Sequence, residues 1–166
     1  MYTNIHVAID GSEWSKGAAN LGLELAQGLG SKLTAVHVNA APRTASRIDR
    51  LRAMLPGTVE VDGESASASE ARVRTGWLAD EADDVGVSFG SERLSGVIHD
   101  ALISYMGESE EDLMVFGAWG TGDGVAPIGS AVERFLRRSQ TDTMVIKKPA
   151  RLAVGEGEYL GEEGAV

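Results

Sequence analysis

The residues best suited to chemistry form a glycine-rich stretch at positions 117–129, GAWGTGDGVAPIG. It follows the apolar run LMVF at 113–116 and precedes Ser130, which with Glu133 fits an S-x-x-E capping box at a helix start. Glycines let backbone amides approach an anion closely, and a helix N-terminus adds unpaired N–H groups and a favourable dipole. The pattern therefore favours a phosphate site. The alternative is a loop whose glycines serve only turn geometry.

This loop matches neither of the common phosphate-binding motifs. It lacks the G-K-[ST] of a P-loop, its alternating glycines do not fit G-x-G-x-x-G, and no Lys or Arg lies between Gly117 and Glu133. Asp123 places a negative charge inside the loop. At 4 Å and a surface-like dielectric it would repel each phosphate charge by about 4 kcal/mol unless Mg²⁺ intervened. Trp119 could either cover a bound base or order the loop by packing.

Asp10 is a second candidate, because its carboxylate ends the apolar run IHVAID at 5–10. Other kinds of site find less support. The three histidines are dispersed without His-x-x-x-His spacing, so a zinc site is not expected, and His6 and His37 are interpreted as core or strand-edge residues. No serine lies in a G-x-S-x-G elbow, and no nucleophile–base pair can be assembled, which disfavours a hydrolase.

The composition narrows the class of protein further. The chain has 166 residues, of which 43% are hydrophobic, which suits one α/β domain. A net charge of −10 makes non-specific binding to nucleic acid or to anionic membranes a poor hypothesis. The absence of cysteine excludes disulfides, thiolate metal sites and a cysteine nucleophile. With no basic leader and no apolar run of membrane-spanning length, we expect a cytoplasmic location.

Alternating strands and helices must position these residues. Ser12 is predicted to cap a helix that ends near Gly28 and Gly30, and a strong apolar stripe predicts another helix from Leu94 to Tyr105. A further helix should follow Ser130. Weaker helical patterns cover 47–55 and 70–82, and strands are predicted at 5–10, 32–38, 85–89, 113–116 and 143–146.

This alternation predicts an α/β fold, an open parallel sheet with helices on both faces. Ligands of such sheets lie beyond the carboxyl ends of the strands, where Asp10, Asn39 and the stretch from Gly117 onward are placed. The domain is expected to span 1–149. The Gly- and Glu-rich tail, 150–166, is expected to be disordered.

Two segments resemble the universal stress protein family and together cover about half of the chain. The family's first strand–helix–strand unit is similar to IHVAIDGSEWSKGAANLGLELAQGLGSKLTAVHV at 5–38. Its carboxyl-terminal signature is similar to LMVFGAWGTGDGVAPIGSAVERFLRRSQTDTMVIKKP at 113–149. The resemblance implies a five-stranded parallel sheet in the order 3-2-1-4-5. It also implies that Gly90 and Ser91 open the helix carrying the Leu94 stripe.

ATP-binding members of that family carry the motif Gly, two residues, Gly, nine residues, Gly, Ser or Thr. This chain matches it with eight residues, not nine, between the second and third glycines. The resemblance implies that Asp10 lies near the ribose and the Mg²⁺-bound phosphates of ATP, and that backbone groups of Ala8 and Val38 frame the adenine. The ribose and phosphates would be held by Gly117, Gly120, Gly129, Ser130 and the amide of Ala131.

The resemblance also implies a homodimer, because family members commonly pair their last strand antiparallel across a two-fold axis. Here that strand would be Thr143, Met144, Val145 and Ile146, a short apolar edge. The leading hypothesis is therefore a dimeric stress-response regulator that binds ATP. No general base is evident, so any ATPase activity should be slow or absent. The alternative is a dimerisation and interaction module, with protein partners, that has lost nucleotide binding.

Overall fold

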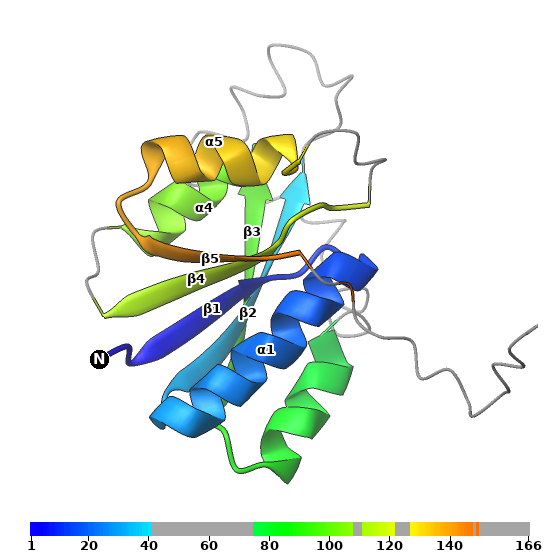
Figure 1. Ribbon diagram of the computed structural model, residues 1–166, viewed down its shortest axis with the longest axis vertical. Coiled ribbons are helices and arrows are strands. Elements are labelled where there is room, and N and C mark those ends of the chain that lie inside the picture. Colours follow the sequence, from blue (N-terminus) through cyan, green and yellow to red (C-terminus); the bar gives the residue numbers. More distant parts are fainter. Residues whose placement is uncertain (41–74, 108–110, 122–126, 148, 150–166) are drawn as a thin grey trace, which may run out of the picture.

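A five-stranded parallel sheet forms the centre of the computed structural model, which describes residues 1–40, 75–107, 111–121, 127–147 and 149. The strand order is β3-β2-β1-β4-β5, as the resemblance implied (Figure 1). The strands are β1 (Asn4–Ala8), β2 (Lys32–Ala40), β3 (Phe89–Gly96), β4 (Asp112–Gly117) and β5 (Asp142–Ile146). The predictions for 47–55, Asp123 and the tail 150–166 fall outside the described residues.

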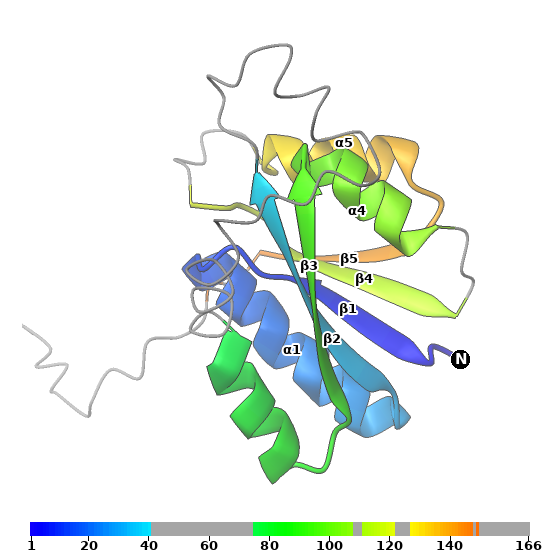
Figure 2. The same ribbon diagram turned by 180° about the vertical axis from the view of Figure 1, so that it is seen from behind.

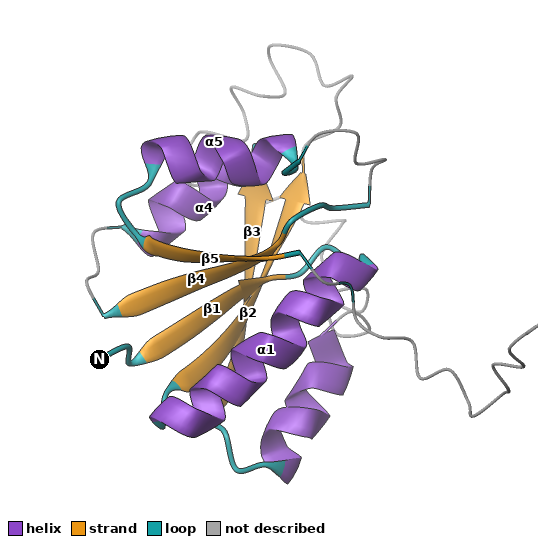
Figure 3. Cartoon of the chain, viewed as in Figure 1, coloured by secondary structure: helices purple, strands orange, loops and turns teal. Residues whose placement is uncertain are grey.

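Helices cover both faces of the sheet, which confirms the predicted class. α1 (Glu13–Leu29) and a helix that includes residues 75–84 lie on one face, and α4 (Ile98–Met106) and α5 (Ser130–Arg138) lie on the other (Figures 1 and 2). Figure 3 shows the resulting three layers of helix, sheet and helix. Among the described residues, no helix combines the length and the apolar character needed to cross a membrane.

Short local signals fix the ends of α1. The Ser12 hydroxyl accepts a hydrogen bond of 3.1 Å from the backbone N–H of Ser15, which satisfies one of the unpaired amides of the first turn. Gly30 ends the helix in the left-handed conformation, with a φ of 67°, whereas Gly28 lies inside the last turn. The predicted cap at Ser12 and the stop at Gly30 are therefore confirmed, whereas the prediction that Gly28 also ends the helix is wrong.

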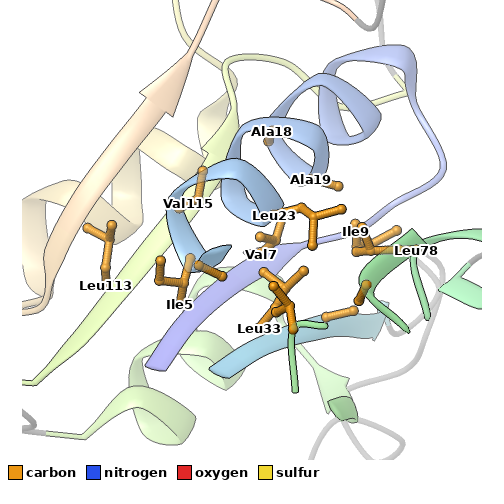
Figure 4. Close-up of a cluster of buried hydrophobic side chains, with 14 residues drawn as sticks. Ile5, Val7, Ile9, Ala18, Ala19, Leu23, Leu33, Leu78, Leu113 and Val115 are labelled. Atoms are coloured by element: carbon orange, nitrogen blue, oxygen red, sulfur yellow. The ribbon is translucent and has the colours of Figure 1, made fainter. Parts of the chain in front are cut away.

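Two apolar clusters hold the layers together. Figure 4 shows the first, in which Ile5 and Val7 of β1 pack against Leu23 of α1 with Leu33 of β2 and Leu78 close by. The second lies between the sheet and the other pair of helices, where α4 and α5 cover the side chains of Val36, Met114 and Phe116. β1 is buried on both faces, as expected for the central strand of a parallel sheet.

The third strand begins later than its pattern predicts. A strand at 85–89 was predicted, but β3 runs from Phe89 to Gly96, and Gly86 makes a turn with a φ of 73°. Gly90 and Ser91, expected to open a helix, lie inside β3 instead. The reason is that β3 is an edge strand whose exposed residues are polar, so its sequence lacks the apolar run of an inner strand. Leu94 belongs to this strand.

His6, the middle residue of β1, is a buried polar side chain that is only 7% exposed. Its Nε2 lies 3.7 Å from Asp112 Oδ2, beyond hydrogen-bond distance, and has no hydrogen-bond partner in the described part of the chain. The Tyr105 hydroxyl lies 3.4 Å from its Nδ1. Burial lowers the pKa of His6, against an opposing effect of Asp112 and Glu92; Lys32 lowers it further.

Acid is therefore expected to destabilise the fold through His6. The folded-state pKa lies below the unfolded value of about 6.5, so below that pH the unfolded chain takes up the proton first. Stability should fall as pH drops through this window and level off below the folded-state pKa. Midpoints of urea unfolding, measured from pH 7.5 to 5, should fall as the pH falls. In His6→Gln the midpoint should depend less on pH. An equal slope in that variant would contradict the assignment.

Candidate functional site

The candidate site lies at the carboxyl edge of the sheet, where β1 and β4 end side by side (Figure 1). The chain leaves β1 into α1 on one face and leaves β4 toward α5 on the other. Neighbouring strands that diverge in this way create the crevice in which open α/β sheets bind ligands. Asp10, the described ends of the glycine-rich stretch (117–121 and 127–129) and the start of α5 all belong to this edge.

Asp10 and Gly120 lie against each other across this edge. One carboxylate oxygen of Asp10, Oδ1, accepts a hydrogen bond of 2.9 Å from the backbone N–H of Ser12. A methyl group placed on Gly120 would lie 2.6 Å from the other oxygen, Oδ2. While the carboxylate keeps this position the approach is too close for a side chain, so glycine at 120 allows the carboxylate to meet the loop backbone. The structure thus brings together two of the residues that the sequence singled out.

Gly117 serves packing. A methyl group there would lie 2.5 Å from the carbonyl carbon of Trp14, so the glycine lets the first turn of α1 rest on the end of β4. Beyond it, the ring of Trp119 packs edge-on against Trp14 with centroids 4.5 Å apart. Of the two interpretations of Trp119, the structure therefore supports the packing role. The Ala118 N–H donates to Ile146 O, which anchors the start of the loop to β5.

The capping box predicted at Ser130 is wrong. Gly129 is the N-cap of α5, with no side-chain cap, and Ser130 is the first helical residue, with an exposed side chain. Glu133 instead binds Arg137 one turn later, with Oε1 2.9 Å from Nη2. The Gly129 N–H donates to Ala118 O at 2.7 Å, which fastens the two ends of the loop together.

The first-turn amides of α5 are the groups that remain for an anion. Ser130 and Ala131 begin the helix, and their N–H groups have no partner within it. Gly129, in contrast, uses its own N–H inside the loop. The predicted set of phosphate ligands is thus divided. The amides of Ser130 and Ala131 have no partner within the helix, whereas Gly117 and Gly129 make contacts inside the protein.

Ala8 and Val38 lie on the face covered by α4 and α5. Both are half-buried and pack against the second apolar cluster. Ala8 is the last residue of β1 and pairs with Val36, so Val38 lies on β2 beyond the point where β1 ends. Both are at the predicted edge, but they are not opposite each other in the ladder.

His37 is the residue at this edge whose role the sequence did not reveal. Its Nδ1 lies 2.7 Å from the carbonyl oxygen of Ile9, the residue before Asp10. Its position beside Val38 was the available signal, but a strand histidine is ordinarily interpreted as a packing residue. In the part of the chain that the structure describes, no group of three or more His, Asp or Glu side chains could hold a metal ion.

Comparison with known proteins identifies the family. The model of the Universal stress protein family matches residues 1–147. The chain belongs to this family. A curated relative, "Universal stress protein MJ0531" of Methanocaldococcus jannaschii, is 24% identical over 153 residues, which cover 91% of this chain and 85% of the relative.

Solved structures of universal stress proteins share the fold. "Universal stress protein UspA from Lactobacillus plantarum" is 26% identical, with a TM-score of 0.67 over 88% of this chain and 98% of that one. An Arabidopsis thaliana family member with AMP bound is 18% identical, with a TM-score of 0.61 over 89% of this chain and 93% of that one. A universal stress protein in complex with cAMP is 20% identical, with the same TM-score, over 87% and 96%. The structural neighbours thus include nucleotide-bound family members.

Proposed function

We propose that this protein binds an adenine nucleotide, ATP with Mg²⁺, at the carboxyl edge of its sheet and acts as a homodimeric stress-response regulator. The observation that carries the proposal is the approach of Asp10 to Gly120, with 2.6 Å between Oδ2 and a methyl group placed on that glycine. This approach brings the carboxylate that follows β1 against a loop that leads into a helix N-terminus. Nucleotide-bound relatives with the same fold support it.

The two sides of the site suit the two halves of a nucleotide. An ionised carboxylate is an acceptor only, so Asp10 suits ribose hydroxyls or a metal ion and repels bare phosphate. The first turn of α5 offers N–H donors and the positive end of a helix dipole, which suit phosphate. Asp10 would orient the ribose and share a Mg²⁺ ion with the phosphates, whose charge that ion would offset.

A second candidate function is a dimeric interaction module without nucleotide. Gly117 and Gly129 favour it, because each is explained by a packing contact or hydrogen bond inside the protein. The loop is also one residue shorter than the motif of ATP-binding members. In this reading the edge is a structural joint between α1, β4 and α5, and a regulatory partner would bind elsewhere.

Calorimetry with purified protein separates the two functions. We expect heat on titration with MgATP, and chromatography of the supernatant after heat denaturation should reveal any adenine nucleotide that copurifies. AMP and cAMP titrated in parallel, with and without Mg²⁺, identify the preferred ligand. No heat at millimolar concentrations of all three, together with no released nucleotide, would leave the interaction module as the function.

The proposed dimer interface is the free edge of β5, and Val145→Pro tests it. The Ala118 N–H donates to Ile146 O, so the backbone N–H and C=O of Ile146 point toward β4. Backbone groups alternate along a strand, so those of Val145 point to the outer edge of β5. Proline removes that N–H without breaking the β4–β5 ladder. Light scattering is expected to show a monomer for Val145→Pro and a dimer for the control Val145→Thr, which keeps the donor. A dimer that persists in both would refute pairing through β5.

A further inference from the structure

The backbone groups of β2 alternate between the two neighbouring strands. The Lys32 N–H donates to Thr3 O, and Val36 O accepts from the N–H of Ile9, so even-numbered residues of β2 turn their N–H and C=O toward β1. By the same alternation, the N–H and C=O of Val38 also point to the β1 side. Val38 lies past the end of β1, whose last residue is Ala8, so these two groups have no β1 residue opposite them.

At the next position of this ladder, the imidazole of His37 contacts the oxygen to which a backbone N–H would ordinarily donate. A regular parallel ladder would continue with a hydrogen bond from the Val38 N–H to Ile9 O. No such bond is among the backbone bonds of the described residues, and Nδ1 of His37 lies 2.7 Å from that oxygen instead. A carbonyl oxygen can only accept, so Nδ1 carries the hydrogen and donates it.

We propose that His37 is a positioning residue that ends the β1–β2 ladder at Ile9 and keeps the backbone N–H and C=O of Val38 open at the candidate site. The ring draws Ile9 O to itself, and the Val38 N–H makes no backbone hydrogen bond to that oxygen in the described residues. The chain then leaves the sheet through Asp10 and Gly11, whose φ of 87° makes the turn. The same bond thus fixes the strand end that carries the Asp10 carboxylate toward Gly120.

The open groups define what they can bind. The N–H and C=O of one extended residue place a donor beside an acceptor, both pointing the same way. Their complement is a flat edge with an acceptor beside a donor, which adenine presents at N1 and its exocyclic amine. Hypoxanthine presents an N–H and a carbonyl in the reverse order. This ligand statement rests on the proposed function, whereas the role of His37 in the ladder does not.

Amide hydrogen exchange tests the ladder without any ligand. In the wild type we expect the Val38 amide to exchange faster than amides within the β1–β2 ladder. In His37→Ala the Val38 amide should take the vacated Ile9 O and exchange about five- to tenfold more slowly, the effect of one net hydrogen bond. His37→Asn, whose side-chain amide can replace Nδ1–H, is the matched control and should exchange as the wild type does. A Val38 amide already protected in the wild type, or unchanged in His37→Ala, overturns the proposal.

Two further measurements keep the test decisive. Nitrogen NMR of the wild type should show neutral His37 as the Nδ1–H tautomer, and the Nε2–H tautomer would overturn the proposal even if His37→Ala fails to fold. With MgATP, His37→Ala should weaken binding about tenfold and His37→Asn should restore it to within about threefold, as expected for one hydrogen bond. If the wild type binds no nucleotide, the proposed function fails, and exchange and tautomer still decide the role of His37.

Discussion

Replacing Gly117 with alanine is expected to destabilise the fold by about 3 kcal/mol, at the upper end of the cost of overpacking. The added methyl group would lie 2.5 Å from the carbonyl carbon of Trp14 and 2.6 Å from its oxygen. Both are backbone atoms in the first turn of α1, so they cannot rotate away as a side chain would. Relief requires α1 to lift from the end of β4, which also separates Trp14 from Trp119.

Thermal or urea unfolding measures this effect, and for a domain of this size the loss corresponds to roughly 10 °C in Tm. Gly28→Ala is the matched control. That glycine lies in α1, a methyl group there would meet nothing within 4 Å, and alanine is the better helix former, so a gain of up to about 1 kcal/mol is expected. Gly117→Ala with the stability of the wild type would show that the contact with Trp14 does not constrain the fold.

The contrast between these glycines shows what the sequence could and could not predict. A strand ending in Gly117 and a helix beginning at Ser130 were predictable, because apolar runs and helical stripes signal elements directly. The purpose of each glycine was not, because turn geometry, phosphate contact and close packing all favour the same residue. Only the position of Trp14, distant in sequence, assigns Gly117 to packing.

The same limit explains the errors in the element boundaries and caps. The inner strands β1, β2 and β4 were predicted because they are buried and their residues are apolar. The edge strand β3 was displaced because one side of it faces solvent and its pattern is polar. At α5, Ser130 and Glu133 have the spacing of a capping box, but the bond between Glu133 and Arg137 and the N-cap at Gly129 replace it.

The part of the site that depends on the end of β1 was predicted in outline. Asp10 could be placed at the carboxyl edge, because parallel strands align their ends and this one ends in a carboxylate. The contact between His37 and Ile9 could not be predicted, because a bond from a side chain to the end of the neighbouring strand leaves no trace in spacing or composition. Residues proposed to bind through their backbone, such as Val38, are likewise invisible in the identity of their side chains.

Gly120→Ala is expected to leave the fold nearly intact and to weaken nucleotide binding about tenfold to a hundredfold, the effect of losing a hydrogen bond to a charged group. Here the methyl group would meet Asp10 Oδ2 at 2.6 Å, the far end of a side chain that can rotate away. The cost in stability should therefore stay below about 1 kcal/mol, in contrast to Gly117→Ala. The carboxylate, however, would leave the position from which it is proposed to contact the ligand.

A double-mutant cycle shows whether the effect passes through Asp10. Asp10→Ala alone should weaken MgATP binding to a similar extent, as measured by calorimetry. If Gly120→Ala acts by displacing the carboxylate, it should cost nothing further in the Asp10→Ala background, because the two changes remove the same interaction. Full additivity would mean that the methyl group obstructs the ligand itself, so Gly120 would contact the nucleotide directly. If Gly120→Ala binds MgATP with unchanged affinity, the contact between the Asp10 carboxylate and the loop is not part of the binding site.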